Sequence, residues 1–114
     1  MSEIQATAHL TIHEGKLDAF KAAVEQCVAI VKEKDTGTLQ YDWFLNADET
    51  VCVVREHYTS SEAVLEHMGN LGEALPALLG VCDLSLEIYG SPSDTLLQAL
   101  EGMGINYYSY LAGL

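Results

Sequence analysis

The sequence has few basic residues: five Lys and Arg stand against 17 Asp and Glu, which gives a formal net charge of −12 over 114 residues. Nucleic-acid binding needs clusters of basic side chains at the phosphates, so this composition argues against a nucleic-acid-binding protein. It also argues against binding to anionic membrane surfaces. No apolar run approaches the ~18 residues of a membrane span, and the start, MSEIQ, is not typical of a signal peptide. We therefore expect a cytoplasmic protein.

Cysteine is also scarce, since the chain has only Cys27, Cys52 and Cys82. All three lie among apolar residues, and neither a CxxC pair nor a Cys/His spacing typical of zinc sites is present. We expect three free, buried thiols in a reducing compartment.

Hydrophobic residues make up 49% of the chain, enough for the core of one domain. Alternating apolar residues predict strands at 6–13, 38–46, 50–58 and 81–90, the middle two forming a hairpin. Apolar residues spaced by three and four predict a helix over 16–34. Thr59 as N-cap, with Glu62 in a capping box, predicts a second helix from about residue 60 to 68, which ends at Gly69.

Further helix is expected over 70–79, with Pro76 either kinking it or starting a new turn. Residues 91–94 then open a short helix that runs to about residue 101. The tail after it, GINYYSYLAGL, is apolar and aromatic. We expect this tail to dock as an extra strand or arm, on the domain or on a partner subunit.

The order of these elements predicts an α+β fold, a ferredoxin-like βαββαβ antiparallel sheet with the helices on one face. Strand alternation places Tyr41, Trp43 and Tyr58 on the helix-facing side, together with Leu10, Ile12, Val54, Leu84 and Leu86. The other side is mixed, since it takes His9, Asp42, Phe44, Val51, Val53, Arg55, Asp83 and Glu87. A second sheet packed on this side would explain the mixture. Arg55 is then expected to pair with Asp42 or Glu87, because a lone buried charge is costly.

One local pattern points to a family. Glu56-His57-Tyr58 ends a strand, a polar cap and Ala63 follow, and His67 lies on the next helix. This pattern, together with HEGKLDAFKAAVEQ at 13–26, resembles the antibiotic biosynthesis monooxygenase family of the dimeric α+β barrel superfamily, over roughly residues 5 to 90. The resemblance implies a family domain at 1–90, a C-terminal helix and arm at 91–114 and a homodimer in which two sheets meet.

Members of this family include cofactor-independent oxygenases of quinols and anthrone-like polyketides, haem-degrading enzymes and small isomerases. The chain departs from the haem-degrading pattern. Its first strand carries His9 and Thr11 and no Asn, and Tyr58 stands where those enzymes have a Trp. The resemblance therefore implies chemistry without haem or another cofactor.

His67 is the candidate base, because histidine ordinarily titrates near pH ~6.5. A cofactor-free oxygenase needs a base that removes a phenolic or carbon-acid proton and a dry pocket in which the anion meets oxygen. The alternative is a histidine that only stabilises the end of its helix. Tyr41, Trp43 and Tyr58 form either the wall of a pocket for a flat substrate or an ordinary core. Tyr58 could also donate a hydrogen bond to a substrate oxygen.

Glu56 is the acid of the family pattern. It either orients a histidine, or it makes a salt bridge or belongs to a solvated edge. Arg55 either anchors an anionic substrate or has a structural ion pair. His9, His13 and His57 share the other sheet face, but they complete no known metal motif, and we expect no metal site.

The sequence thus predicts a monooxygenase that works without metal or flavin on a quinol-like or polycyclic aromatic substrate and molecular oxygen. Its candidate catalytic residues are His67, Tyr58 and Glu56, and its candidate substrate contacts are Trp43, Tyr41 and Arg55. Two alternatives stay open: a non-catalytic dimeric module that binds a small ligand, and a small isomerase of the same superfamily.

Overall fold

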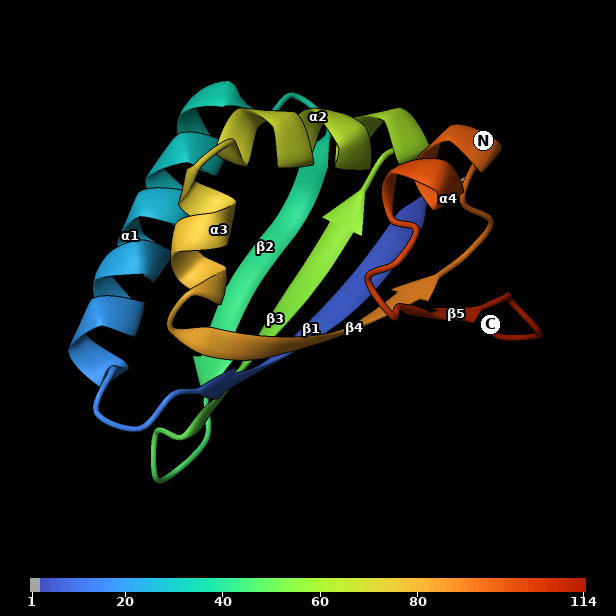
Figure 1. Cartoon of the computed structure of the whole chain (residues 1–114). Coiled ribbons are helices and arrows are strands. Elements are labelled where there is room, and N and C mark those ends of the chain that lie inside the picture. The colour runs from blue at the N-terminus through green and yellow to red at the C-terminus, as the bar shows by residue number, and fades with distance from the viewer. Residues whose placement is uncertain (1–2) are drawn as a thin grey trace.

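The computed structural model describes residues 3–114. This range contains five strands and four helices, whose arrangement Figure 1 shows. In order they are β1 (Ile4–Ile12), α1 (Leu17–Lys34), β2 (Thr38–Leu45), β3 (Val51–Tyr58), α2 (Ser61–Leu71), α3 (Ala74–Leu79), β4 (Cys82–Tyr89), α4 (Asp94–Ala99) and β5 (Asn106–Tyr108).

The strands form one sheet in the order β2-β3-β1-β4-β5. The first four strands pair antiparallel with one another, whereas β5 runs parallel to β4. The helices lie on one face of the sheet (Figure 1). The predicted ferredoxin-like α+β fold is confirmed, and the apolar tail adds an edge strand that makes the sheet mixed.

Strand alternation decides which side chains face the helices, because successive residues of a strand point to opposite faces. Ala8, Leu10 and Val54 are buried under α1 and α3, and Ile4, Tyr58 and Ile88 are buried toward α2 and α4. Tyr41 and Trp43 pack against the first of these clusters. The predicted helix-facing side of the sheet is therefore correct.

Both ends of α2 differ from the prediction. Ser60 is the N-cap, since its hydroxyl accepts a hydrogen bond from the Ala63 amide at 3.2 Å, and the Thr59 amide instead donates to the Gly37 carbonyl. The helix also continues through Gly69 and ends at Gly72, whose φ of 50° is left-handed. Glycine inside a helix costs only ~1 kcal/mol, and burial of Leu71, which is 4% exposed, offsets that cost.

The next two helices begin at local signals. Pro76 lies in the first turn of α3, where its missing N–H is not needed, so it belongs to a new helix. Ser93 caps α4 by accepting a hydrogen bond from the Leu96 amide at 3.1 Å. The Ser93 amide in turn donates to the Ser61 hydroxyl at 2.9 Å, which ties the start of α4 to the start of α2.

The open face of the sheet carries Arg55. Arg55 lies opposite Asp42 in the register of β2 and β3, and no ion pair of Arg55 is found among residues 3–114 of this single chain. The pairing with Asp42 or Glu87 was predicted for a face covered by a second sheet, and it stays a prediction. Arg55 is exposed in this chain, so water solvates its charge and a protein partner is not required.

The three cysteines are free and buried, as predicted. Across residues 3–114, none of the helices combines the length and the apolar character that crossing a membrane requires.

Candidate active site

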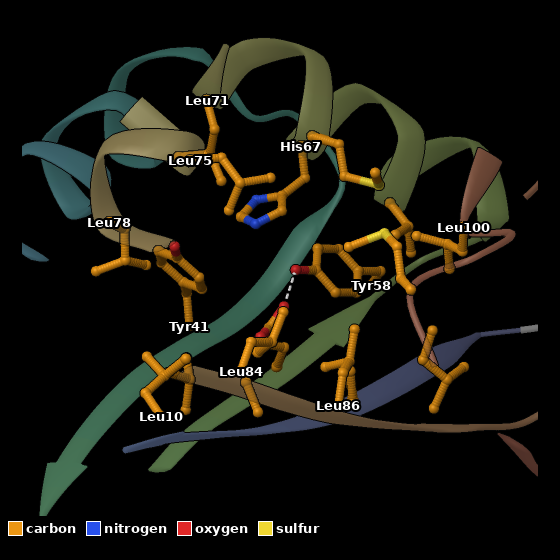
Figure 2. Close-up of a pocket in the computed structure, with 18 of the residues that line it drawn as sticks. Leu10, Tyr41, Tyr58, His67, Leu71, Leu75, Leu78, Leu84, Leu86 and Leu100 are labelled. Atoms are coloured by element: carbon orange, nitrogen blue, oxygen red, sulfur yellow. Dashed lines mark hydrogen bonds between the residues drawn. The ribbon is translucent and has the colours of Figure 1, made fainter. Parts of the chain in front are cut away.

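A cavity of about 100 Å³ lies between the sheet and the helices. Its wall is mostly aliphatic, with Leu78 toward one end and Leu100 toward the other (Figure 2). The polar side chains in this wall are few: His67, Glu56, Tyr41 and Tyr58, with the indole of Trp43 beside them.

His67 projects from α2 into this cavity, and its side chain is only 7% exposed. Its imidazole lies between two tyrosine rings (Figure 2), with ring centroids 5.0 Å from Tyr41 and 5.2 Å from Tyr58. Both contacts are edge-on. Within residues 3–114, no hydrogen bond involves the Nε2 atom of His67. This nitrogen is thus free for a ligand in an apolar surrounding.

The other nitrogen of His67 is held by a carboxylate. Nδ1 lies 2.8 Å from Oδ2 of Asp35, whose side chain is only 1% exposed. Asp35 follows the last residue of α1, and it also accepts hydrogen bonds from Asn70 Nδ2 at 2.8 Å and from Thr38 Oγ1 at 2.6 Å. His67 and Asn70 are three residues apart on α2, so they reach Asp35 from one face of the helix.

These hydrogen bonds keep Asp35 ionised. Burial acts to raise the pKa of this carboxyl, but the hydrogen bonds from Asn70, Thr38 and His67 favour the charged form and outweigh it. The net pKa of Asp35 lies below its usual value. His67 therefore faces a buried negative charge on its Nδ1 side.

Glu56 and Tyr58 form the second polar group of the cavity. Both side chains project from β3 to the helix-facing side, and the Tyr58 hydroxyl donates a hydrogen bond to Glu56 Oε1, drawn as the dashed line in Figure 2. Burial raises the pKa of Glu56, although the Tyr58 hydrogen bond and the charge of His67 oppose the rise. Burial, and then the charge of Glu56, raise the pKa of Tyr58 as well. Both shifts act in favour of the protonated form of each group.

Comparison with known protein families shows to which family the chain belongs. The sequence profile of the antibiotic biosynthesis monooxygenase family matches residues 4–71, more than half of the chain. The chain belongs to this family. Among proteins with curated descriptions, none matches the sequence.

Solved structures share the family fold. MupZ from Pseudomonas fluorescens superimposes with a TM-score of 0.86 at 23% identity, over 98% of this chain and 93% of that one. SnoaB, a cofactor-independent oxygenase from Streptomyces nogalater, gives 0.68 at 14% identity, over 82% of this chain and 96% of that one. Rv0793 from Mycobacterium tuberculosis gives 0.62 at 20% identity, over 81% and 96%. At these identities the likeness is one of fold.

The structure brings five of the six sequence-predicted site residues to one cavity: His67, Tyr58, Glu56, Tyr41 and Trp43. Arg55, the sixth, is not part of this cavity. It lines a separate polar depression on the opposite face of the sheet, so a substrate bound beside His67 has no contact with it. The carboxylate that contacts His67 is Asp35, whereas Glu56 bonds to Tyr58.

Three polar residues around His67 were missed from the sequence: Asp35, Asn70 and Thr38. One signal pointed to Asp35. The carbonyl end of a helix disfavours negative charge, yet Asp35 directly follows the last turn of α1. Asn70 was hidden because α2 was expected to end at Gly69. Within residues 3–114, no group of three or more His, Cys, Asp or Glu side chains could hold a metal ion, and the expected absence of a metal stays a prediction.

Proposed function

We propose that this family member is a monooxygenase that needs no cofactor, with His67 as its base. One observation carries the proposal: a histidine with a free Nε2 projects into a cavity that is otherwise mostly aliphatic. In such a surrounding a deprotonated substrate is electron-rich and shielded from water, which favours its direct reaction with oxygen. The family supports a monooxygenase role, and SnoaB shows that a protein of this fold can be a cofactor-independent oxygenase.

The proposed reaction balances without an added reductant. His67 Nε2 removes a proton from a hydroxyl or an acidic carbon of the substrate. Oxygen then takes electrons from the resulting anion, one of its atoms enters the substrate and the other leaves as water. The substrate itself is oxidised. In the substrate complex the Tyr58 hydroxyl would exchange its hydrogen bond to Glu56 for one to the substrate oxygen on which negative charge develops.

The cavity volume narrows the substrate class. An engineered cavity of about 150 Å³ in another protein accepts benzene, and the cavity beside His67 measures about 100 Å³. A single-ring quinol-like substrate therefore fits best, after modest movement of the wall. A polycyclic aromatic substrate would have to extend beyond the cavity. Tyr41 and Trp43, with ring centroids 5.3 Å apart, would contact the ring.

The test is oxygen uptake by the purified protein with a panel of hydroquinones, naphthohydroquinones and anthrones, measured against the autoxidation rate. The variants are His67→Ala and, as a matched control, His13→Ala. The His13 side chain is 40% exposed, its partner is Asp83, and it does not line the cavity. We expect uptake above background that His67→Ala removes and His13→Ala keeps. Uptake at the autoxidation rate for every substrate would contradict the proposal.

A second candidate is an isomerase that needs no oxygen. It is favoured by a buried carboxyl with a raised pKa, Glu56, in the same cavity as a candidate base, His67, because proton transfer between two carbons needs an acid and a base. Formation of an isomer of the substrate in the absence of oxygen would distinguish it from the oxygenase. A protein that binds a quinol without either reaction would instead be a binding module.

A further inference from the structure

We infer that Asp35, clamped by Asn70 and Thr38, is a positioning residue that fixes His67 in the tautomer with the proton on Nδ1 and the lone pair of Nε2 directed to the cavity. This role is separate from the identity of the base itself. Its consequence for catalysis rests on the proposed function, but the tautomer can be measured without any substrate.

The direction of the hydrogen bond follows from the chemistry of its partners. An ionised carboxylate can only accept hydrogen bonds. Since Asp35 Oδ2 lies 2.8 Å from His67 Nδ1, the proton of that bond must belong to Nδ1. In the neutral imidazole the other nitrogen, Nε2, is then unprotonated and able to accept a proton. A carboxylate on the far side also stabilises the imidazolium that forms when Nε2 takes a proton.

The carboxylate is itself held in place. Asn70 donates to its Oδ1, while Thr38 and His67 share its Oδ2. These partners come from α2 and from the start of β2, so they fix the carboxylate between two elements of the fold. Its position at the carbonyl end of α1 is electrostatically unfavourable, and three hydrogen bonds compensate. A buried charge kept at such a place by neighbours that also orient a cavity histidine indicates a functional constraint.

A conservative variant tests the inference because it can reverse the hydrogen bond. In Asp35→Asn the side-chain oxygen can still accept from Asn70, and the new NH₂ group would face Thr38 Oγ1 and His67 Nδ1. Both of these atoms can accept a hydrogen bond, so the shape is kept. An NH₂ donor requires an unprotonated Nδ1, which moves the proton of the neutral imidazole to Nε2.

The matched control is Glu66→Gln. Glu66 lies one residue before His67 on α2 and accepts hydrogen bonds from the amide and the hydroxyl of Thr36 at 3.0–3.1 Å. It is thus a second carboxylate that joins α2 to the segment after α1, but it makes no hydrogen bond with His67 among residues 3–114. If Asp35 only joined α2 to the segment after α1, Glu66→Gln should have the same effects as Asp35→Asn.

The measurement is long-range ¹H–¹⁵N NMR of the histidine side chains, read in the alkaline limit of a pH series so that the neutral tautomer is observed. We expect the Nδ1–H tautomer of His67 in the wild type and in Glu66→Gln, and the Nε2–H tautomer in Asp35→Asn. An Nε2–H tautomer in the wild type, or an unchanged tautomer in Asp35→Asn, would overturn the inference. Should Asp35→Asn fail to fold, the wild-type tautomer alone decides.

Activity adds a second readout. With a substrate from the oxygen-uptake panel, Asp35→Asn should lower kcat by ~10²-fold or more, the usual contribution of a positioned base, with KM changed little. Glu66→Gln should keep both. The two proposals fail in different ways. If the expected tautomers are found but no substrate gives oxygen uptake, the oxygenase proposal is refuted and the role of Asp35 in fixing the tautomer stands. If Asp35→Asn does not impair oxygen uptake, only the positioning role of Asp35 is refuted and the oxygenase proposal stands.

Discussion

Two glycines offer a direct test of how α2, the helix that carries His67, is held in the fold. A Cβ atom added at Gly37 would lie 2.6 Å from Ala63 Cβ and 2.8 Å from Thr59 Oγ1. A Cβ added at Gly69 would have nothing within 4 Å. Neither glycine has a left-handed backbone, so alanine causes no φ strain at either position. The same substitution should therefore have opposite effects at the two sites.

The magnitudes follow from these contacts. Gly69 is an exposed residue inside α2, so Gly69→Ala should raise the free energy of unfolding by ~1 kcal/mol, the difference in helix propensity. At Gly37 the methyl group overlaps the first turn of α2, and such overpacking costs about 1–3 kcal/mol. Alanine also narrows the unfolded ensemble, which returns roughly 0.4–1 kcal/mol. A net loss of about 1–2 kcal/mol is expected for Gly37→Ala.

Urea denaturation followed by far-UV circular dichroism measures both variants, and thermal unfolding checks them. For a chain of 114 residues, 1 kcal/mol corresponds to a change in Tm of roughly 4 °C. Gly69→Ala should raise Tm, and Gly37→Ala should lower it and weaken the His67–Asp35 contact, because α2 must move away from β2. A Gly37→Ala protein as stable as the wild type would refute the close approach, and a destabilised Gly69→Ala protein would refute the continued helix.

Three further predictions concern the core. Glu56→Gln should stabilise the protein at neutral pH. Because burial raises the folded-state pKa of Glu56 above its unfolded-state value, the unfolded state ionises first as the pH rises, and this opposes folding. Urea midpoints of wild type and variant should therefore lie closest below the unfolded-state pKa of ~4.3 and diverge as the pH rises above it. Leu96→Ala should cost about 2–5 kcal/mol in urea denaturation, since Leu96 lies on the buried side of α4 and is 0% exposed; a loss under about 1 kcal/mol would argue against this packing. Trp43→Phe should cost less than Leu96→Ala in the same assay, because the buried indole Nε1 has no hydrogen-bond partner among residues 3–114 and its removal leaves no lost bond. An equal or larger loss would contradict this expectation.

Local signals explain why most of the fold could be predicted. Alternation in β1 and β4 and three-to-four spacing in α1 reflect burial on one face, which the sequence records directly. The errors fall where two local signals compete. Thr59 and Ser60 are both good caps, and only the contact of Thr59 with Gly37 leaves Ser60 to cap α2. Gly69 is a good helix end, but burial of Leu71 extends the helix past it.

Some residues of the candidate site could be predicted from a local pattern, and others depend on contacts between distant elements. His67, Tyr58 and Glu56 lie close together in the sequence, at the end of β3 and on α2. Their local pattern was therefore enough to predict them as site residues. Asp35 is 32 residues from His67, and only the packing of the end of α1 against α2 brings the two together. The ion pair predicted for Arg55 depends on a second sheet over the open face, and in this single chain Arg55 is exposed.

The sequence by itself determined the order of strands and helices, the apolar face of the sheet and the histidine on α2, because each of these depends on spacing along one element. Only the tertiary structure decided which carboxylate holds that histidine, which of its nitrogens is free and how small the cavity beside it is. Hydrogen bonds and cavities depend on atoms from distant elements meeting within about 3 Å, and spacing within one element does not specify how distant elements meet.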